Sequence, residues 1–412
     1  MEHYHYDGTE KMTLPWPSSK KWNRVALPLL NVSLLPTAAL LFFLKYAFNL
    51  HFHRVNSSRI GHLAHDNEVF LRKRRLGMIK KGAVYIGIAA HGVCNQALLR
   101  ILQRQMTIWQ IPQTRLWRSF TKIVATQSIL SRWKLFYVFP STFNALAEYN
   151  HLEPSLSFIP EEEQQGQELL ETMGIRNWFI CFHSRDSLHL AKFLKKGDRK
   201  HDFRNSRIEQ YLPAAGYIAL RGGYALRMGA TVEQEIPKDK HHRVIDYAFQ
   251  YRTEFGDIFL PAKCKFFLGS TSGIANISYI FNVPVAHANF VPITNPFPPG
   301  NKDLFIPKKI WSAKEKRFLT FREMLDSPII NSWQFRQFRE EDGLIPMDNT
   351  AEEILELARE MNERLDGTWE STPEDEALQH KFKAVWTPDL PQHRSSCRLG
   401  ADFLRKNKYL LD

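Results

Sequence analysis

Three side chains that can do chemistry, those of His183, Arg185 and Asp186, directly follow an apolar, β-prone run over residues 179–182. This order predicts a strand that ends at a binding site, because ligands of open α/β sheets bind just beyond the carboxyl ends of parallel strands. A guanidinium offers paired, planar donors that suit phosphate oxygens, so Arg185 is predicted to bind a diphosphate. A salt bridge between domains is the alternative role for this arginine.

His183 and Asp186 are predicted to be the catalytic residues. His183 lies two positions before Arg185, so the two side chains share a face of an extended strand and contact the same ligand. A hydrogen-bonded core histidine is the alternative. Asp186 is predicted to take the proton of a hydroxyl as a general base, or else to orient Arg185. Asp202 and Asp257 are the substitute carboxylates.

Two later segments repeat the arrangement of an apolar run followed by polar residues. One run ends on Arg227, and another ends on the turn Gly269-Ser270-Thr271-Ser272-Gly273 before a helix-like stretch over 274–280. Small residues let backbone amides approach an anion, hydroxyls add donors, and a following helix would present its positive end. We therefore predict that Arg227 and this turn bind the same diphosphate, although such turns also serve as plain chain breaks.

Two further groups are predicted to recognise an acceptor or a base. Asp202, Arg204 and Asn205 lie in a polar loop, which the start of a helix would explain equally well. Gly61 and His62 lie where an early strand is expected to turn into a helix. There the glycine would either let a ligand approach or simply close a tight turn.

Composition limits the classes of partner. The chain has 412 residues, of which 44% are hydrophobic and 24% are charged, as in ordinary globular proteins. A formal net charge of +12 points to anionic partners, namely membrane surfaces, phosphorylated ligands or nucleic acid. Nucleic acid is disfavoured, because there is no zinc-finger spacing, RNA-reading aromatic motif or long Lys/Arg tract. The four cysteines form no C-x-x-C pair, which fits reduced thiols in the cytoplasm.

The apolar stretch over residues 25–50 is a candidate membrane-contacting segment. About 20 apolar residues suffice to cross a bilayer, but Pro28, Asn31 and Pro36 divide this stretch. Its uninterrupted part, residues 37–44, is too short to span, and basic residues lie on both sides of that part: Lys20, Lys21, Arg24, Lys45, His51, His53 and Arg54. The pattern favours a helical segment in an anionic membrane interface, at the inner face of the cell membrane. A buried helical hairpin and a true span are the alternatives.

The order of apolar runs predicts an α/β chain in four parts. An N-terminal tail and apolar membrane-associating segment would occupy residues 1–54, and a first Rossmann-like domain residues 55–159. A second Rossmann-like domain would follow over 160–345, beginning with the acidic helix after Pro160. Residues 346–412 would form a helix, capped by Thr350, and an extended tail.

The succession of these motifs resembles a bacterial family of surface-polysaccharide glycosyltransferases of the GT-B type, over about residues 55–310. The matching motifs begin at Arg59, His183, Asp202, Arg227, Ile245 and Gly269. More distantly, His183-Ser184-Arg185 and the Gly269 turn resemble the fucosyltransferase superfamily. That resemblance implies that Arg185 and residues 270–272 hold the diphosphate of a GDP-linked sugar without a metal.

The resemblance implies two Rossmann-like domains facing a cleft, with the nucleotide sugar held by the second domain and a glycan or lipid-linked acceptor approaching from the first. The expected reaction is an inverting, metal-independent sugar transfer, since no Asp-x-Asp motif occurs. The nucleotide sugar is a co-substrate, and no cofactor or metal site is expected. A non-catalytic nucleotide- or sugar-binding component of a membrane polysaccharide assembly is the alternative.

Overall fold

The computed structural model describes residues 27–79, 81–89, 92–111, 136–138, 151–185, 202–230, 232, 235–237, 242–294, 298, 300–327, 343–387 and 391–412. The chain forms two compact units. Unit 1 comprises Met1–Ala145 and Pro154–Ser157, and unit 2 comprises Leu146–Glu153 and Phe158–Asp412. The four cysteines are free thiols, and Cys181, Cys264 and Cys397 are buried.

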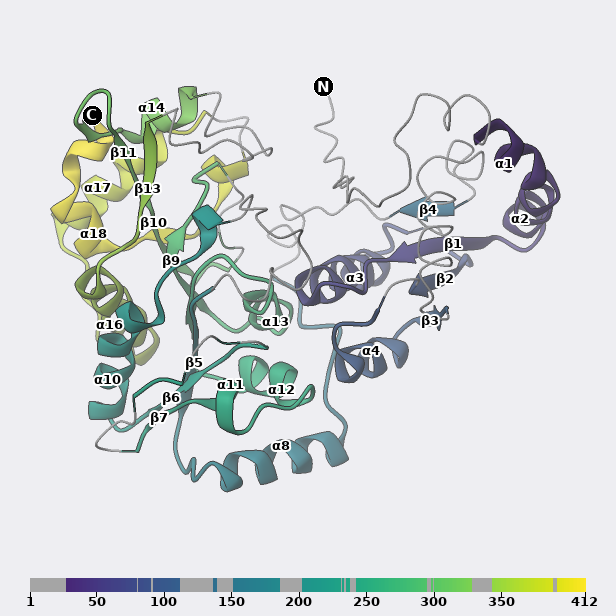
Figure 1. Cartoon of the computed structure of the whole chain (residues 1–412), viewed down its shortest axis with the longest axis horizontal. Helices are drawn as coiled ribbons and strands as arrows, with labels where there is room; N and C mark the ends of the chain where they lie inside the picture. The colour runs from purple at the N-terminus through teal and green to yellow at the C-terminus, as the bar shows by residue number, and fades with distance from the viewer. Residues whose placement is uncertain are drawn as a thin grey trace. The chain divides into compact units, whose positions relative to one another are not determined.

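Unit 1 contains a four-stranded parallel sheet in the order β3-β2-β1-β4. Figure 1 shows α1 and α2 at the end of this sheet where β1 begins. The elements are α1 (Leu27–Ser33), α2 (Leu35–Ala47), β1 (Leu50–Val55), α3 (Ile60–Arg75), β2 (Val84–Ala89), α4 (Gln96–Gln103), β3 (Thr107–Gln110) and β4 (Phe136–Val138). Among the described residues, no helix has the length and apolar character needed to cross a membrane.

The predicted boundary between residues 54 and 55 is wrong, because β1 pairs with both β2 and β4. His53, expected to flank a membrane segment, is fully buried, and its ring stacks on Phe70 with 5.8 Å between centroids. Burial lowers the pKa of His53 to about 3, so its imidazole is neutral. Gly87 lies opposite it, and a β-carbon there would come within 2.9 Å of His53 Nε2.

Unit 2 contains a seven-stranded parallel sheet in the order β14-β10-β9-β8-β5-β6-β7. Apart from the edge strand β14, this is the order of a doubly wound nucleotide-binding sheet, with β5 as its first strand. The strands are β5 (Phe179–His183), β6 (Tyr224–Arg227), β7 (Val244–Ile245), β8 (Phe267–Gly269), β9 (Val285–Phe290), β10 (Leu304–Pro307) and β14 (Arg398–Leu399). The predicted α/β architecture with parallel sheets is confirmed in both units.

Helices cover both faces of the unit 2 sheet. Figure 1 shows α10 and α16 on one face and α8, α12 and α13 on the other. The α-helices are α8 (Pro160–Thr172), α10 (Leu212–Leu220), α11 (Tyr247–Gln250), α12 (Gly256–Lys263), α13 (Ala275–Ile280), α14 (Phe321–Asp326), α16 (Ala351–Asp366), α17 (Pro373–Ala384) and α18 (Ala401–Lys406). Thr350 caps α16 as predicted, since its side chain accepts a hydrogen bond from the Glu353 amide.

Short elements complete unit 2. A three-stranded antiparallel sheet has the order β12-β11-β13, with β11 at Lys309–Ser312, β12 at Arg317–Phe318 and β13 at Leu344–Met347. The 3-10 helices are η2 (Asp202–Arg204), η3 (Ile208–Tyr211), η5 (Pro391–Arg394) and η6 (Lys408–Leu411).

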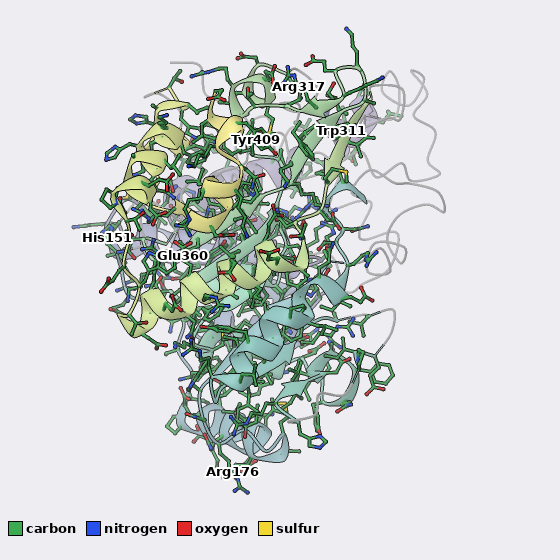
Figure 2. All side chains as sticks on the ribbon, turned by 90° about the vertical axis from the view of Figure 1, so that its left-hand side faces the viewer. His151, Arg176, Trp311, Arg317, Glu360 and Tyr409 are labelled. Carbon is green, nitrogen blue, oxygen red and sulfur yellow. The ribbon has the colours of Figure 1, made fainter. Side chains whose placement is uncertain are left out.

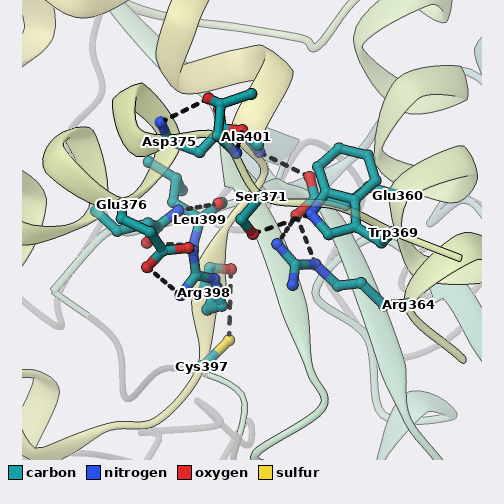
Figure 3. A network of polar contacts seen from close by, with 12 residues as sticks. Glu360, Arg364, Trp369, Ser371, Asp375, Glu376, Cys397, Arg398, Leu399 and Ala401 are labelled. Carbon is teal, nitrogen blue, oxygen red and sulfur yellow. Dashed lines mark hydrogen bonds and ion pairs between the residues drawn. The ribbon is translucent and has the colours of Figure 1, made fainter. Parts of the chain in front are cut away.

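The expected extended C-terminal tail is wrong. Residues 398–399 add the edge strand β14, and Leu399, Phe403, Leu404 and Leu410 are buried in the main core. A polar network also joins this segment to α16 and α17 (Figure 3). Glu360 accepts hydrogen bonds from the Ala401 amide at 2.7 Å and from Arg364 Nε at 2.8 Å, and Arg398 forms two bonds with Glu376. Apolar burial and paired charges together fold this segment onto the sheet.

Candidate functional site

The candidate site of unit 2 lies where β5 and β8 end side by side. The chain leaves β5 for β6 on one side of the sheet, and β8 continues the sheet on the other side, so this is the topological switch point. The Ser270 amide donates to the His183 carbonyl oxygen at 3.1 Å, and the Arg185 amide donates to Ser270 Oγ at 3.0 Å. The structure therefore brings Arg185 and the Gly269 turn together, as the sequence predicts.

Close packing of the strand ends requires a glycine at position 269. A β-carbon at this position would lie 2.8 Å from the His183 carbonyl oxygen, so only glycine lets the two strand ends approach this closely. Gly269 therefore contributes to ligand binding indirectly, since it sets the position of the turn beside Arg185.

The hydroxyls of the turn fall into two groups. Ser270 is fully buried, and its Oγ holds the Arg185 amide. Thr271 Oγ1 and Ser272 Oγ are buried too, yet neither has a hydrogen-bond partner among the described residues. A buried hydroxyl without a partner is costly, so these two oxygens are candidates to donate to a bound anion.

Arg204 also belongs to this cluster. Its Nη2 donates to the Thr271 carbonyl oxygen at 2.8 Å, which brings the cation of η2 to the turn. The Ser206 amide donates to the Arg185 carbonyl oxygen at 3.0 Å, and Ser184 Oγ donates to the Ser206 carbonyl oxygen at 2.5 Å. Arg185, Arg204 and two hydroxyls of the turn thus lie at one edge of the sheet, a set of residues suited to a polyanion such as a diphosphate.

The predicted contribution of a helix N-terminus is weak. The helix after the turn, α13, spans only six residues, and its Ile274 cap makes no side-chain cap hydrogen bond.

A hydrogen bond holds the imidazole ring of His183 in place. Its Nδ1–H donates to the Met228 carbonyl oxygen at 2.9 Å, which leaves Nε2 as the second ring nitrogen. The side chain is partly exposed. This hydrogen bond orients the imidazole, and the catalytic role of His183 stays a prediction.

Arg227 does not fit its predicted role. Its side chain is 4% exposed, and Nη1 donates to Asp246 Oδ2 at 3.0 Å in a buried ion pair. Asp246 also accepts hydrogen bonds from the Ile236 and Phe249 amides. A guanidinium inside the protein needs such a counter-charge, so we assign Arg227 to the support of β6 and remove it from the diphosphate site.

The remaining predictions have mixed outcomes. Asp186 lies outside the described residues, as does the side chain of Asp202, whose backbone begins η2. The Asn205 carbonyl oxygen accepts from Lys308 Nζ at 2.7 Å. Asp257 is ion-paired with Arg252 at 2.8 Å and is 3% exposed. Burial raises the pKa of Asp257 to about 6, and its pairing favours a structural role.

Unit 1 has an equivalent switch point after β1, which lies between β2 and β4. Gly61 and His62 lie there, in the first turn of α3. His62 Nδ1 donates to Asp66 Oδ2 at 3.2 Å, and His65 Nδ1 lies 3.5 Å from the other oxygen. Burial would raise the pKa of Asp66, but the two imidazoles outweigh it and hold that pKa below its usual value. An ionised carboxylate thus orients His62, as a general base requires.

Sequence reasoning missed two residues beside the turn of unit 2. His287 lies on β9 opposite Gly269, is 4% exposed, and interacts with Arg204 electrostatically. Burial lowers the pKa of His287 to about 4. Lys308, also buried, joins Asn205 to Asp348, whose Oδ1 lies 2.6 Å from Nζ. Each follows an apolar strand pattern that reads as plain core, so only the sheet order could have revealed it.

No protein-family model matches the chain, and a comparison with curated protein sequences finds no match. Solved structures similar to part of the chain include the ADP-heptose LPS heptosyltransferase II of E. coli. That comparison has 13% identity and a TM-score of 0.42, and covers 62% of this chain and 90% of the other. The comparison with a family 9 glycosyl transferase from Veillonella parvula has 11% identity and a TM-score of 0.39, and covers 61% of this chain and 82% of the other.

The E. coli heptosyltransferase WaaC with ADP gives 10% identity, a TM-score of 0.34, and coverage of 63% of this chain and 91% of the other. At these TM-scores the similarity assigns neither fold nor activity. The likeness to fucosyltransferases and the GT-B arrangement therefore stay predictions.

Proposed function

We propose that this protein is a glycosyltransferase that takes a sugar from a nucleotide-sugar donor bound by unit 2. The observation that carries the proposal is the adjacency of Arg185, Arg204 and the Ser270-Thr271-Ser272 turn at the switch point between β5 and β8. In doubly wound sheets this edge holds the phosphates of nucleotides. The acceptor is proposed to be a hydroxyl of a cell-surface glycan or glycolipid, and the location to be peripheral at the cytoplasmic face of the membrane.

The positive side chains have a defined task in this reaction. The acceptor oxygen attacks the anomeric carbon while the bond from that carbon to the diphosphate oxygen breaks, and the nucleoside diphosphate leaves with the electron pair. Arg185 and Arg204 would stabilise the charge that grows on this leaving group. A single displacement of this kind inverts the anomeric centre. In this proposal no metal ion is required, because guanidinium groups provide the stabilisation.

A base must take the proton of the acceptor hydroxyl. Asp186 remains the candidate predicted from the sequence. The His62–Asp66 pair is a second candidate, because the Asp66 carboxylate accepts a hydrogen bond from Nδ1 and orients the imidazole. His62 is moreover at the switch point of unit 1, where an acceptor would bind by the same rule as the donor in unit 2.

The test is a turnover assay with ADP-, GDP- and UDP-linked sugars, an isolated cell-surface glycolipid fraction as acceptor, and EDTA throughout. Release of nucleoside diphosphate is expected with one donor class. His62→Ala should lower turnover about 100-fold or more without loss of donor affinity if His62 is the base. His151→Ala, at an exposed histidine of unit 2, is the matched control. Binding without release from any donor would contradict a transferase and leave a binding component.

A further inference from the structure

The surface around α1 and α2 is unusually apolar for one exposed to water. Of the 18 large hydrophobic side chains found exposed among the described residues, 11 lie between residues 29 and 84. They include Phe42 at 51%, Phe43 at 57%, Tyr46 at 66% and Phe48 at 62% exposure. Exposed apolar side chains gathered on neighbouring elements in this way indicate an interaction site.

A cationic groove lies beside these helices. It has a volume of about 490 Å³ and is lined by Arg74, Arg75 and Lys81, together with Leu76 and Tyr85. The three cations are exposed. Tyr85 stacks on His51 with 5.0 Å between ring centroids, and the Val84 amide donates to the Asn49 carbonyl oxygen at 3.0 Å. Because residues 48–49 join α2 to β1, the residues that line the groove lie at the end of the sheet where α2 leads into β1.

The sequence of this region carries a strong excess of positive charge. The first 145 residues carry 20 Lys and Arg but only 5 Asp and Glu, whereas the rest of the chain carries 35 and 38. Within the described part of unit 1 the acidic residues are Asp66 and Glu68. Asp66 contacts His62 and His65, and Glu68 is buried against Arg72, whose Nε lies 2.7 Å from its Oε1. The excess positive charge of the chain therefore belongs to unit 1.

We propose that this face of unit 1, formed by α1, α2 and the Arg74/Arg75/Lys81 groove, docks onto a membrane surface that contains anionic lipids. The aromatic side chains of α2 would enter the headgroup region, where such rings are favoured, and the groove would receive lipid phosphates. Nucleic acid would bind the same cations, but it would leave the exposed apolar side chains of Leu29, Val32 and Leu40 on the adjoining helices in water. This proposal stands independently of the transferase activity.

The test is co-sedimentation of the full chain with phosphatidylcholine vesicles, with and without 30% phosphatidylglycerol. We expect binding only to the anionic vesicles. Arg74→Glu/Arg75→Glu/Lys81→Glu should weaken it at least tenfold, whereas Lys302→Glu/Lys314→Glu/Lys316→Glu, exposed cations of unit 2 with the same change in charge, should not.

A second pair of variants tests the apolar component. Phe42→Ser/Phe43→Ser should weaken vesicle binding at least tenfold, and Leu220→Ser/Phe249→Ser, exposed at 75% and 57% in unit 2, should leave it unchanged. Circular dichroism checks that each variant is folded. Equal losses in the unit 1 and unit 2 variants, absence of binding to anionic vesicles, or binding to RNA in place of vesicles would overturn the proposal.

Discussion

At the scale of residues, the hydroxyls of the turn after β8 separate a stabilising role from a binding role. Ser270 Oγ holds the Arg185 amide, so Ser270→Ala should lower the free energy of unfolding by about 1–3 kcal/mol. Thr271 Oγ1 has no partner among the described residues, so Thr271→Val should leave stability equal or higher while weakening nucleotide binding. Urea unfolding and calorimetric titration measure the two effects. A Thr271→Val protein that is clearly less stable would show that this hydroxyl has a structural partner.

Asp303 provides a test by pH. Its carboxylate is fully enclosed and accepts hydrogen bonds from the Val285 and Gly300 amides, and burial raises its pKa from 3.8 to about 7. The folded state therefore holds this proton more tightly than the unfolded chain. Between about pH 4 and pH 7 the Asp303 contribution to stability falls as the pH rises, by at most about 1.4 kcal/mol per pH unit.

Asp303→Asn should remove this dependence. The stability of the variant relative to the native protein should rise from pH 4.5 to pH 7.5 in urea unfolding experiments. Asp326→Asn, which makes the same change at an exposed carboxylate, is the control. If the stability difference between Asp303→Asn and the native protein does not change with pH, the raised pKa of Asp303 is wrong.

At the scale of elements, continuous apolar runs made β5, β6 and β8 predictable, and the Thr350 cap made α16 predictable. β1 was missed because His51, His53 and Arg54 interrupt its apolar residues, and such a pattern is typical of a surface segment. The structure shows that His53 is buried and neutral. The edge strand β14 is only two residues long. Such a strand is specified by its neighbours in the sheet and by the core around Phe403, which local sequence does not contain.

The role of β1 predicts the outcome of truncation. Removal of residues 1–48 leaves β1 complete and should preserve the unit 1 sheet. Removal of residues 1–55, the cut that the sequence alone would suggest, deletes the strand between β2 and β4 and should unfold unit 1. Circular dichroism and limited proteolysis would report the difference, and unit 2 should keep its nucleotide affinity in both. A folded, protease-resistant unit 1 in the shorter protein would contradict the central place of β1.

At the scale of the whole molecule, each unit provides one switch point, and polar residues predicted from the sequence lie at both. The sequence could indicate Arg185, the turn after β8 and His62, because each directly follows an apolar strand pattern or begins a helix. It could not show that Arg227 pairs with Asp246 or that Arg204 reaches the Thr271 carbonyl oxygen, because those contacts depend on how distant segments pack.

The central claim is that unit 2 binds a nucleoside diphosphate through Arg185. The direct measurement is isothermal titration of ADP, GDP and UDP, in EDTA, into the native protein, Arg185→Ala and Arg176→Ala. Arg176 is exposed before the amino end of β5, at the far margin of unit 2 (Figure 2), so it is the matched control. Arg185→Ala should weaken binding of the preferred diphosphate at least about tenfold, the lower range for a hydrogen bond to a charged group, and Arg176→Ala should not. Unchanged affinity in a folded Arg185→Ala protein, or no binding of any of the three diphosphates to the native protein, would contradict the account.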